Sequence, residues 1–151
     1  MTTDALLAIA HHLAVFSLVS LLVVELVLMR GPLGADTIGR FSRIDALYGI
    51  AAIAVVAAGI ARVAWGLIPA DFYLGNLFFW VKMGTLAAIA ILSIDPTVRS
   101  ARWRRAVAAD PGWTAPEAEI RRARRIIHVE LALLPLIPIS AVLMARGIGA
   151  L

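Results

Sequence analysis

Residues 5–29 read ALLAIAHHLAVFSLVSLLVVELVLM, a stretch in which Glu25 carries the only formal charge. An α-helix rises about 1.5 Å per residue, so a run of this length can cross a hydrocarbon core about 30 Å thick. A cleavable signal peptide is the alternative, but the stretch lacks a basic leading segment and ends at Arg30 instead of at a small-residue cleavage site. We therefore interpret it as a retained transmembrane helix.

Three more apolar runs follow along the chain. Hydrophobic residues make up 62% of the 151 residues and charged residues 16%, whereas soluble domains are roughly 45–50% apolar. This composition excludes a water-soluble globule. With no internal repeat and no linker, the sequence predicts a single transmembrane domain over residues 1–151, an all-α integral membrane four-helix bundle. The expected helices are at about residues 5–29, 44–68, 74–94 and 115–146.

The arginines set the expected orientation. Eleven of the 14 basic residues lie in two connectors, and an even number of crossings places both connectors on one side of the membrane. The positive-inside rule makes that side cytoplasmic. We therefore expect a multi-pass protein of the bacterial inner membrane with both termini external. The connector residues are Arg30, Arg40, Arg43, Arg99, Arg102, Arg104, Arg105, Arg121, Arg122, Arg124 and Arg125.

The connector over residues 95–125 is predicted to have structure of its own. Residues 98–109 are typical of a short cytoplasmic interfacial helix on anionic headgroups of the lipid bilayer, and a partner-binding surface is the alternative. Thr114 and Glu117 have the spacing of a capping box, which predicts the start of the fourth helix. Two prolines inside that helix, Pro135 and Pro138, are expected to bend it.

Several function classes are excluded or disfavoured. The chain has no cysteine, which excludes a disulfide, a thiolate zinc site and covalently attached haem. It also lacks a Walker loop, a GxSxG elbow and an HExxH pair, so soluble hydrolases, nucleotide-dependent enzymes and zinc enzymes are disfavoured. The net charge of +4 does not indicate nucleic acid, because the arginines interrupt hydrophobic runs instead of covering one face of a soluble module.

Ionisable residues at membrane depth fall into two layers. Such groups are costly in lipid and usually face the interior of a bundle or a water-filled cavity. His11 and Glu25 are 14 residues apart, within roughly 40° of one helix face, whereas His12 lies about 100° from His11. The two histidines therefore cannot point at one centre. The external layer is His11, His12, Arg62, Lys82 and Arg146, and the cytoplasmic layer is Glu25, Asp45, Asp95, His128 and Glu130.

Three interpretations of these layers compete. In the first, the polar groups are structural: His11 or His12 forms hydrogen bonds between helices, and Arg62 and Lys82 reach the external headgroups. The carboxylates of Glu25, Asp45 and Glu130 then pair with cytoplasmic arginines. In the second, the external layer is a cofactor pocket, where His11 or His12 ligates the iron of haem b, Met83 is the opposite ligand, and Arg62 and Lys82 neutralise the propionates. In the third, the acidic cytoplasmic layer carries protons or ions.

A string of short motifs carries a family resemblance over nearly the whole chain. The motifs are His11-His12-Leu13-Ala14, Arg43-Ile44-Asp45-Ala46-Leu47-Tyr48-Gly49, Gly59-Ile60-Ala61-Arg62, Tyr73-Leu74-Gly75-Asn76, Lys82 and Ser93-Ile94-Asp95-Pro96-Thr97. In this combination the chain resembles a bacterial family of predicted inner-membrane proteins with a four-helix domain of unknown function. That resemblance implies the fold and supplies no established activity.

More distantly, the chain is similar to the CopD-like group of haem-binding membrane proteins, which includes the HemJ-type protoporphyrinogen oxidases. The shared features are a histidine early in the first helix and a lysine, Lys82, that follows aromatic residues in the third. The HemJ-type proteins have a histidine near the end of the lysine-bearing helix, where this chain has Ser93-Ile94-Asp95. The resemblance implies haem b binding, and this departure argues against porphyrinogen oxidation.

We therefore predict a small inner-membrane protein that binds haem b in a redox or porphyrin-related role, with Tyr73 or Asn76 lining the mouth of the pocket. The alternative is a non-catalytic accessory subunit of a larger membrane complex, because alanine-rich helix faces suit close contact with a membrane-protein partner or a second copy of the chain. The residues assign neither a catalytic group nor an enzyme class.

Overall fold

The computed structural model describes residues 2–151, and the side chains from residue 3 onward. Over this range, four segments are long and apolar enough to cross a membrane, the last of them formed by two consecutive helices. The all-α membrane fold with four spans is therefore confirmed. The helices are α1 (Thr2–Leu28), α2 (Ala35–Trp65), α3 (Ala70–Leu74), α4 (Leu77–Ala109), α5 (Glu117–Leu133) and α6 (Leu136–Ala145).

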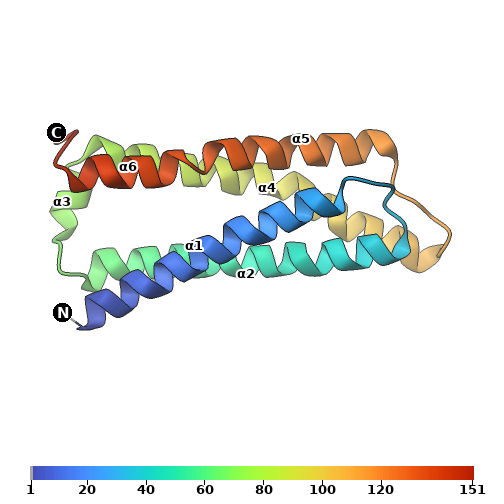
Figure 1. The fold of residues 1–151 in the computed structure, drawn as a ribbon, viewed down its shortest axis with the longest axis horizontal. Helices are drawn as coiled ribbons and strands as arrows, with labels where there is room; N and C mark the ends of the chain where they lie inside the picture. The colour runs from blue at the N-terminus through green and yellow to red at the C-terminus, as the bar shows by residue number, and fades with distance from the viewer. Residues whose placement is uncertain (1) are drawn as a thin grey trace.

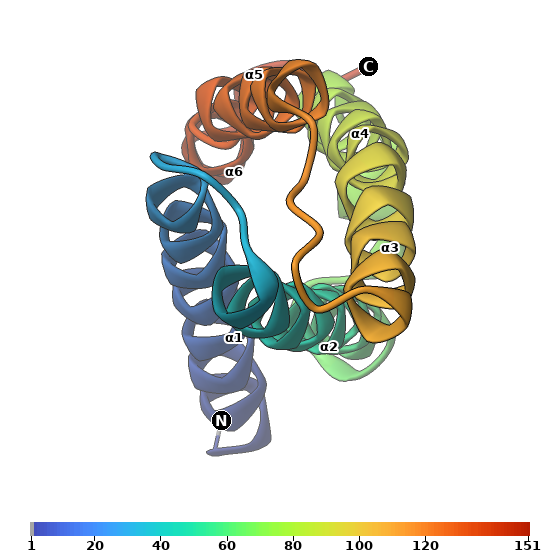
Figure 2. The same cartoon turned by 90° about the vertical axis from the view of Figure 1, so that its right-hand side faces the viewer.

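The four spans run up and down, so the two chain ends lie at the same end of the bundle, together with α3 (Figure 1). We call this the outer end. The opposite end, which we call the arginine end, holds the α1–α2 and α4–α5 connections. Figure 2 looks along the bundle and shows the spans as a ring, with α2 between α1 and α4, and with α5 and α6 opposite α2. α1 also contacts α5, but its first turns lean away from α6.

The separate interfacial helix predicted for residues 98–109 is wrong, because α4 continues through Pro96 to Ala109. Trp103, which was expected at the lipid surface, is fully buried and its ring centroid lies 6.0 Å from that of Phe41 on α2. A helix of 33 residues is about 50 Å long, whereas the hydrocarbon core is about 30 Å thick. α4 is therefore longer than a hydrocarbon core is thick, and its last turns pack against α2 at the arginine end as a helical extension of the bundle.

α2 begins at Ala35, well before the expected start at residue 44. The added turns belong to the same extension, since Ile38 and Phe41 are completely buried there. α4 begins at Leu77 instead of residue 74, because the Asn76 side chain accepts a hydrogen bond from the backbone N–H of Phe78 at 2.9 Å and caps the helix.

The fourth span is interrupted at Pro135, one of the two prolines that were expected to bend it. α5 ends at Leu133 and α6 begins at Leu136, because Pro135 has no N–H to continue the helical hydrogen bonds. The predicted capping box at the start of this span is wrong: the helix begins at Glu117 after Pro116, and no side chain caps it. The preceding loop is fixed instead by a backbone bond from the Ala115 N–H to the Leu33 carbonyl at 3.0 Å.

The bundle has two apolar cores of unequal size. A small cluster of Tyr73, Phe79 and Met144 holds the outer end. The larger cluster joins α1, α2, α4 and α5 from the middle of the bundle to the arginine end, so the polar groups of that half are held in the more densely packed region. Its buried members are Leu18, Leu22, Met29, Leu33, Ile38, Phe41, Tyr48, Ala51, Val55, Trp103, Ala115, Ile120, Ala123 and Ile127.

Candidate functional site

Three carboxyl groups from three helices lie buried in the arginine half of the bundle. Glu25 on α1, Asp45 on α2 and Glu130 on α5 are 2%, 8% and 1% exposed. Glu25 interacts electrostatically with both of the others, and Glu130 also interacts with Asp45. We call these three residues the carboxyl cluster. Within residues 2–151, none of them forms an ion pair with a basic side chain.

Hydroxyl groups from α2 and α4 surround the carboxyl cluster. Ser93 Oγ lies 2.7 Å from Glu130 Oε1, 3.0 Å from the Tyr48 hydroxyl oxygen and 2.9 Å from the Ile89 carbonyl oxygen. Thr97, one turn further along α4, donates a hydrogen bond to Asp45 Oδ1 at 2.7 Å. Glu25 differs from the other two, because its buried Oε1 has no hydrogen-bond partner among the described residues.

Asp95 and Glu119, two other acidic groups near the arginine end, are compensated by arginines. Asp95 pairs with Arg99 at 2.5 Å and with Arg122 at 3.1 Å. Glu119 pairs with Arg102 and accepts a hydrogen bond from Trp103 Nε1 at 2.8 Å.

The interpretation that Glu25, Asp45 and Glu130 pair with arginines is wrong, because these three residues form no ion pair in the described part of the chain. These three side chains point into the bundle, whereas several arginines of α5, such as Arg121 and Arg125, are exposed on its outside. The carboxyl groups and the arginines that lie near them in sequence therefore do not meet in the structure.

A second polar group lies toward the outer end, where α1, α2 and α4 contribute His11, Arg62 and Lys82. His11 is half-buried and interacts electrostatically with Arg62 and Lys82, so these predicted site residues are brought together. The His11 ring lies beside Gly59, where a Cβ would stand 3.6 Å from its Cε1. Lys82 Nζ lies 5.5 Å from the centroid of the Phe79 ring.

This outer polar group contains unsatisfied atoms. His11 Nδ1 and Arg62 Nε are buried and have no hydrogen-bond partner in the part of the chain that the structure describes. Over the same residues, neither Arg62 nor Lys82 forms an ion pair. Buried polar atoms of native proteins are normally hydrogen-bonded, so these two are places where a bound anion or cofactor could supply a partner.

The remaining predicted site residues have other contacts, although the His12 ring centroid lies 6.1 Å from that of His11. His12 is exposed, and its Nδ1 lies 2.6 Å from the Ala8 carbonyl oxygen. Tyr73 and Met83 pack in the small outer core. Asn76 caps α4 and also donates a hydrogen bond to the Ile148 carbonyl at 3.1 Å, which ties the C-terminal segment to the bundle.

Sequence reasoning missed the hydroxyl groups of the carboxyl cluster. Tyr48 lies three residues after Asp45, and Thr97 lies four residues after Ser93, so each pair shares one helix face. That spacing was the available signal. Among residues 2–151, no group of three or more His, Asp and Glu side chains is placed to hold a metal ion.

Comparison with known proteins identifies one family. The family described as "Predicted membrane protein (DUF2214)" matches residues 3–149, nearly the whole chain. Searches among curated proteins and among solved structures found no match. The resemblance to predicted membrane proteins is thus confirmed, while the distant similarity to the CopD-like group receives no support from these comparisons.

Proposed function

We propose that this chain, which belongs to the DUF2214 family of predicted membrane proteins, binds and releases protons at the carboxyl cluster inside its transmembrane bundle. The observation that carries the proposal is that Glu25, Asp45 and Glu130 are buried together without an ion pair to any residue from 2 to 151. Adjacent anions in a low-dielectric interior repel one another and lack solvation. A proton bound to one or more of the three carboxyl groups lowers the free-energy cost of this repulsion and missing solvation.

The hydrogen bonds around Ser93 support this proposal. A serine hydroxyl has one proton, yet Ser93 Oγ lies within hydrogen-bond distance of two acceptors, the Ile89 carbonyl and the Glu130 carboxyl. If Glu130 carries a proton, it donates to Ser93, Ser93 donates to Ile89, and Tyr48 donates to Ser93. Every oxygen in this arrangement then has a partner, which is the normal state of buried polar groups.

The route by which protons reach the cluster is proposed to lead from the arginine end. Asp45 and its partner Thr97 lie one turn closer to that end than Tyr48 and Ser93, and Thr97 is exposed. Toward the outer end, 14 residues of α1, about 21 Å of helix, separate Glu25 from His11. The arrangement supports a site reached from one side. In the orientation given by the positive-inside rule, that side is the cytoplasm of a bacterial inner membrane.

Chemical modification tests this function. Carbodiimides react with protonated carboxyl groups, so a membrane-soluble carbodiimide is expected to modify Glu25 in the bilayer, as detected by mass spectrometry of its peptides. The same reagent is expected to leave Asp95 unmodified, because two arginines hold that carboxyl as an ion pair. The variant Glu25→Gln, neutral and similar in shape, provides the control for assignment of the label.

The residues that are labelled, and the pH dependence of the labelling, decide whether the carboxyl cluster binds protons. Labelling of Glu25 that decreases as the pH is raised supports proton binding, and equal labelling of Asp95 contradicts it. If no residue of the carboxyl cluster reacts, proton binding is contradicted and the alternative of a non-catalytic accessory subunit gains support. The buried polar groups would then orient helices, and the protein is expected to co-migrate with a larger membrane complex after gentle solubilisation.

A second candidate function is haem b binding at the outer polar group, which the unpartnered Nδ1 of His11 favours. A neutral imidazole nitrogen can ligate haem iron, and Arg62 with Lys82 would supply positive charge for the propionates. We assign the ligand to His11 instead of His12, because the His12 ring is exposed and already contacts the Ala8 carbonyl. When bound, the haem would supply one-electron redox chemistry.

Haem binding predicts a visible absorption spectrum. Protein expressed in haem-replete cells and purified in mild detergent is expected to show a Soret band that changes on reduction with dithionite. His11→Ala should abolish the band because it removes the iron ligand, whereas the matched variant His12→Ala should retain it. Lys82→Ala is expected to weaken haem retention without breaking the iron bond. A wild-type protein with no Soret band contradicts haem binding and leaves the carboxyl cluster proposal unaffected.

A further inference from the structure

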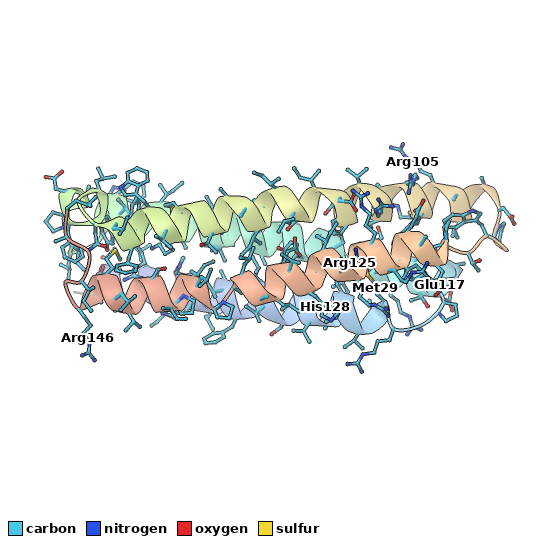
Figure 3. All side chains as sticks on the ribbon, turned by 90° about the horizontal axis from the view of Figure 1, so that it is seen from above. Met29, Arg105, Glu117, Arg125, His128 and Arg146 are labelled. Carbon is cyan, nitrogen blue, oxygen red and sulfur yellow. The ribbon has the colours of Figure 1, made fainter. Side chains whose placement is uncertain are left out.

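A groove of about 340 Å³ opens between the end of α1 and the first half of α5, at the arginine end of the bundle. Its lining residues are Leu26, Arg30, Arg124 and His128. Leu26 precedes Arg30 by four residues and His128 follows Arg124 by four residues, so both lie about one helical turn closer to the middle of the bundle than the arginines. In Figure 3, His128 is seen on α5 toward the end of α1 that carries Met29.

The basic side chains of this groove have no acidic partner in the described chain. Four other arginines of α4 and α5 form ion pairs with Asp95, Glu117 or Glu119, but Arg30 and Arg124 form none within residues 2–151. The His128 ring is held against its own helix, because Nδ1 lies 2.7 Å from the Arg124 carbonyl oxygen. Its Nε2 is left as the free ring nitrogen. The groove therefore presents fixed positive charge to an anion.

Apolar surface adjoins the charged part of the groove on its membrane side. Leu26 forms part of the wall, and Val23, three residues before it on the same side of α1, is 42% exposed. A freely dissolved anion gains nothing from contact with this apolar surface. A phospholipid can place its charged phosphate at the basic side chains and its acyl chains against the apolar ones. Basic pockets between transmembrane helices on the cytoplasmic side are a recurring form of anionic-lipid site.

We propose that the groove between α1 and α5 binds an anionic phospholipid of the surrounding bilayer, with its phosphate between Arg30 and Arg124 and its acyl chains along Leu26 and Val23. The proposal is independent of the carboxyl cluster. It gives a definite site for the anionic headgroups that the arginine-rich connectors were expected to contact.

Lipid binding to the purified full-length protein tests the site. The probes are phosphatidylglycerol, zwitterionic phosphatidylcholine and inorganic phosphate, added to delipidated protein in detergent and followed by native mass spectrometry. We expect phosphatidylglycerol to bind more tightly than phosphatidylcholine. Arg30→Gln and Arg124→Gln are each expected to weaken phosphatidylglycerol binding about fivefold, and the double variant about thirtyfold.

The matched control is Arg105→Gln, since Arg105 is an exposed arginine at the same end of the bundle but lies on α4, on the opposite side in Figure 3. This variant is expected to leave lipid binding nearly unchanged. An equal loss in the control, equal binding of the two phospholipids, or displacement of phosphatidylglycerol by inorganic phosphate would each overturn the proposal. Arg124→Lys, which keeps the charge, replaces Arg124→Gln if the latter does not fold, and is expected to retain most of the binding.

Discussion

Replacement of Trp103 by alanine is expected to lower the free energy of unfolding by about 3–5 kcal/mol, the usual range for removal of a large buried aromatic side chain. Trp103 has no exposed surface, its ring packs on Phe41, and its Nε1 donates a hydrogen bond to Glu119. The variant loses all three interactions and leaves a cavity at the arginine end, where α2, α4 and α5 meet.

Thermal or denaturant unfolding in detergent measures this loss. Trp103→Phe retains most of the packing and loses the hydrogen bond, so its loss is expected to be about 1 kcal/mol. Trp65→Ala, at a side chain 72% exposed, is expected to change stability by no more than about 0.5 kcal/mol. If Trp103→Ala is as stable as Trp65→Ala, residues 98–109 do not pack in a helical extension and lie on the membrane surface instead.

The membrane-spanning part of the fold was accessible from local sequence. The apolar runs are long enough to name four helices, and an even number of crossings places both chain ends together, as Figure 1 shows. The break at Pro135 was accessible for the same reason, because a missing N–H acts on its own helix whatever surrounds it.

The extension at the arginine end was not accessible, because it depends on contacts between distant residues. Residues 98–109 combine one tryptophan with several arginines, and an isolated helix of that composition belongs at a lipid surface. Phe41 and Glu119, which lie far from Trp103 in sequence, give its ring and its N–H partners inside the protein. Tertiary packing therefore decides between a helix on the membrane and a helix that continues out of it.

The candidate site likewise has one part that local sequence predicts and another part that depends on contacts between distant residues. Helical periodicity places His11 and Glu25 on one interior face of α1, and both face the interior in the structure. The distance in sequence to the nearest arginine could not show which of the carboxyl groups form ion pairs with arginines. Asp95 meets Arg99 because the two are one turn apart on α4, whereas Glu130 points away from the exposed arginines of its own helix and toward Ser93.

The second large effect that we expect is that the substitution Glu25→Gln removes a protonated carboxyl group from the interior of the bundle. Glu25 is 2% exposed and its Oε1 has no hydrogen-bond partner within residues 2–151, so the charged form would be poorly stabilised there. Glutamine is neutral and nearly the same size, and the variant is therefore expected to fold like the wild type. Asp95→Asn serves as the control, because Asp95 is held as a carboxylate by Arg99 and Arg122.

Infrared spectroscopy of the protein in lipid at neutral pH observes this proton directly. Exposed carboxyl groups are ionised under these conditions, so the carbonyl-stretching band of a protonated carboxyl reports on buried groups. We expect the wild type to show such a band, Glu25→Gln to lose all or part of it, and Asp95→Asn to keep it unchanged. A wild-type spectrum without the band, or a band that survives replacement of each of Glu25, Asp45 and Glu130, would contradict proton binding by the carboxyl cluster.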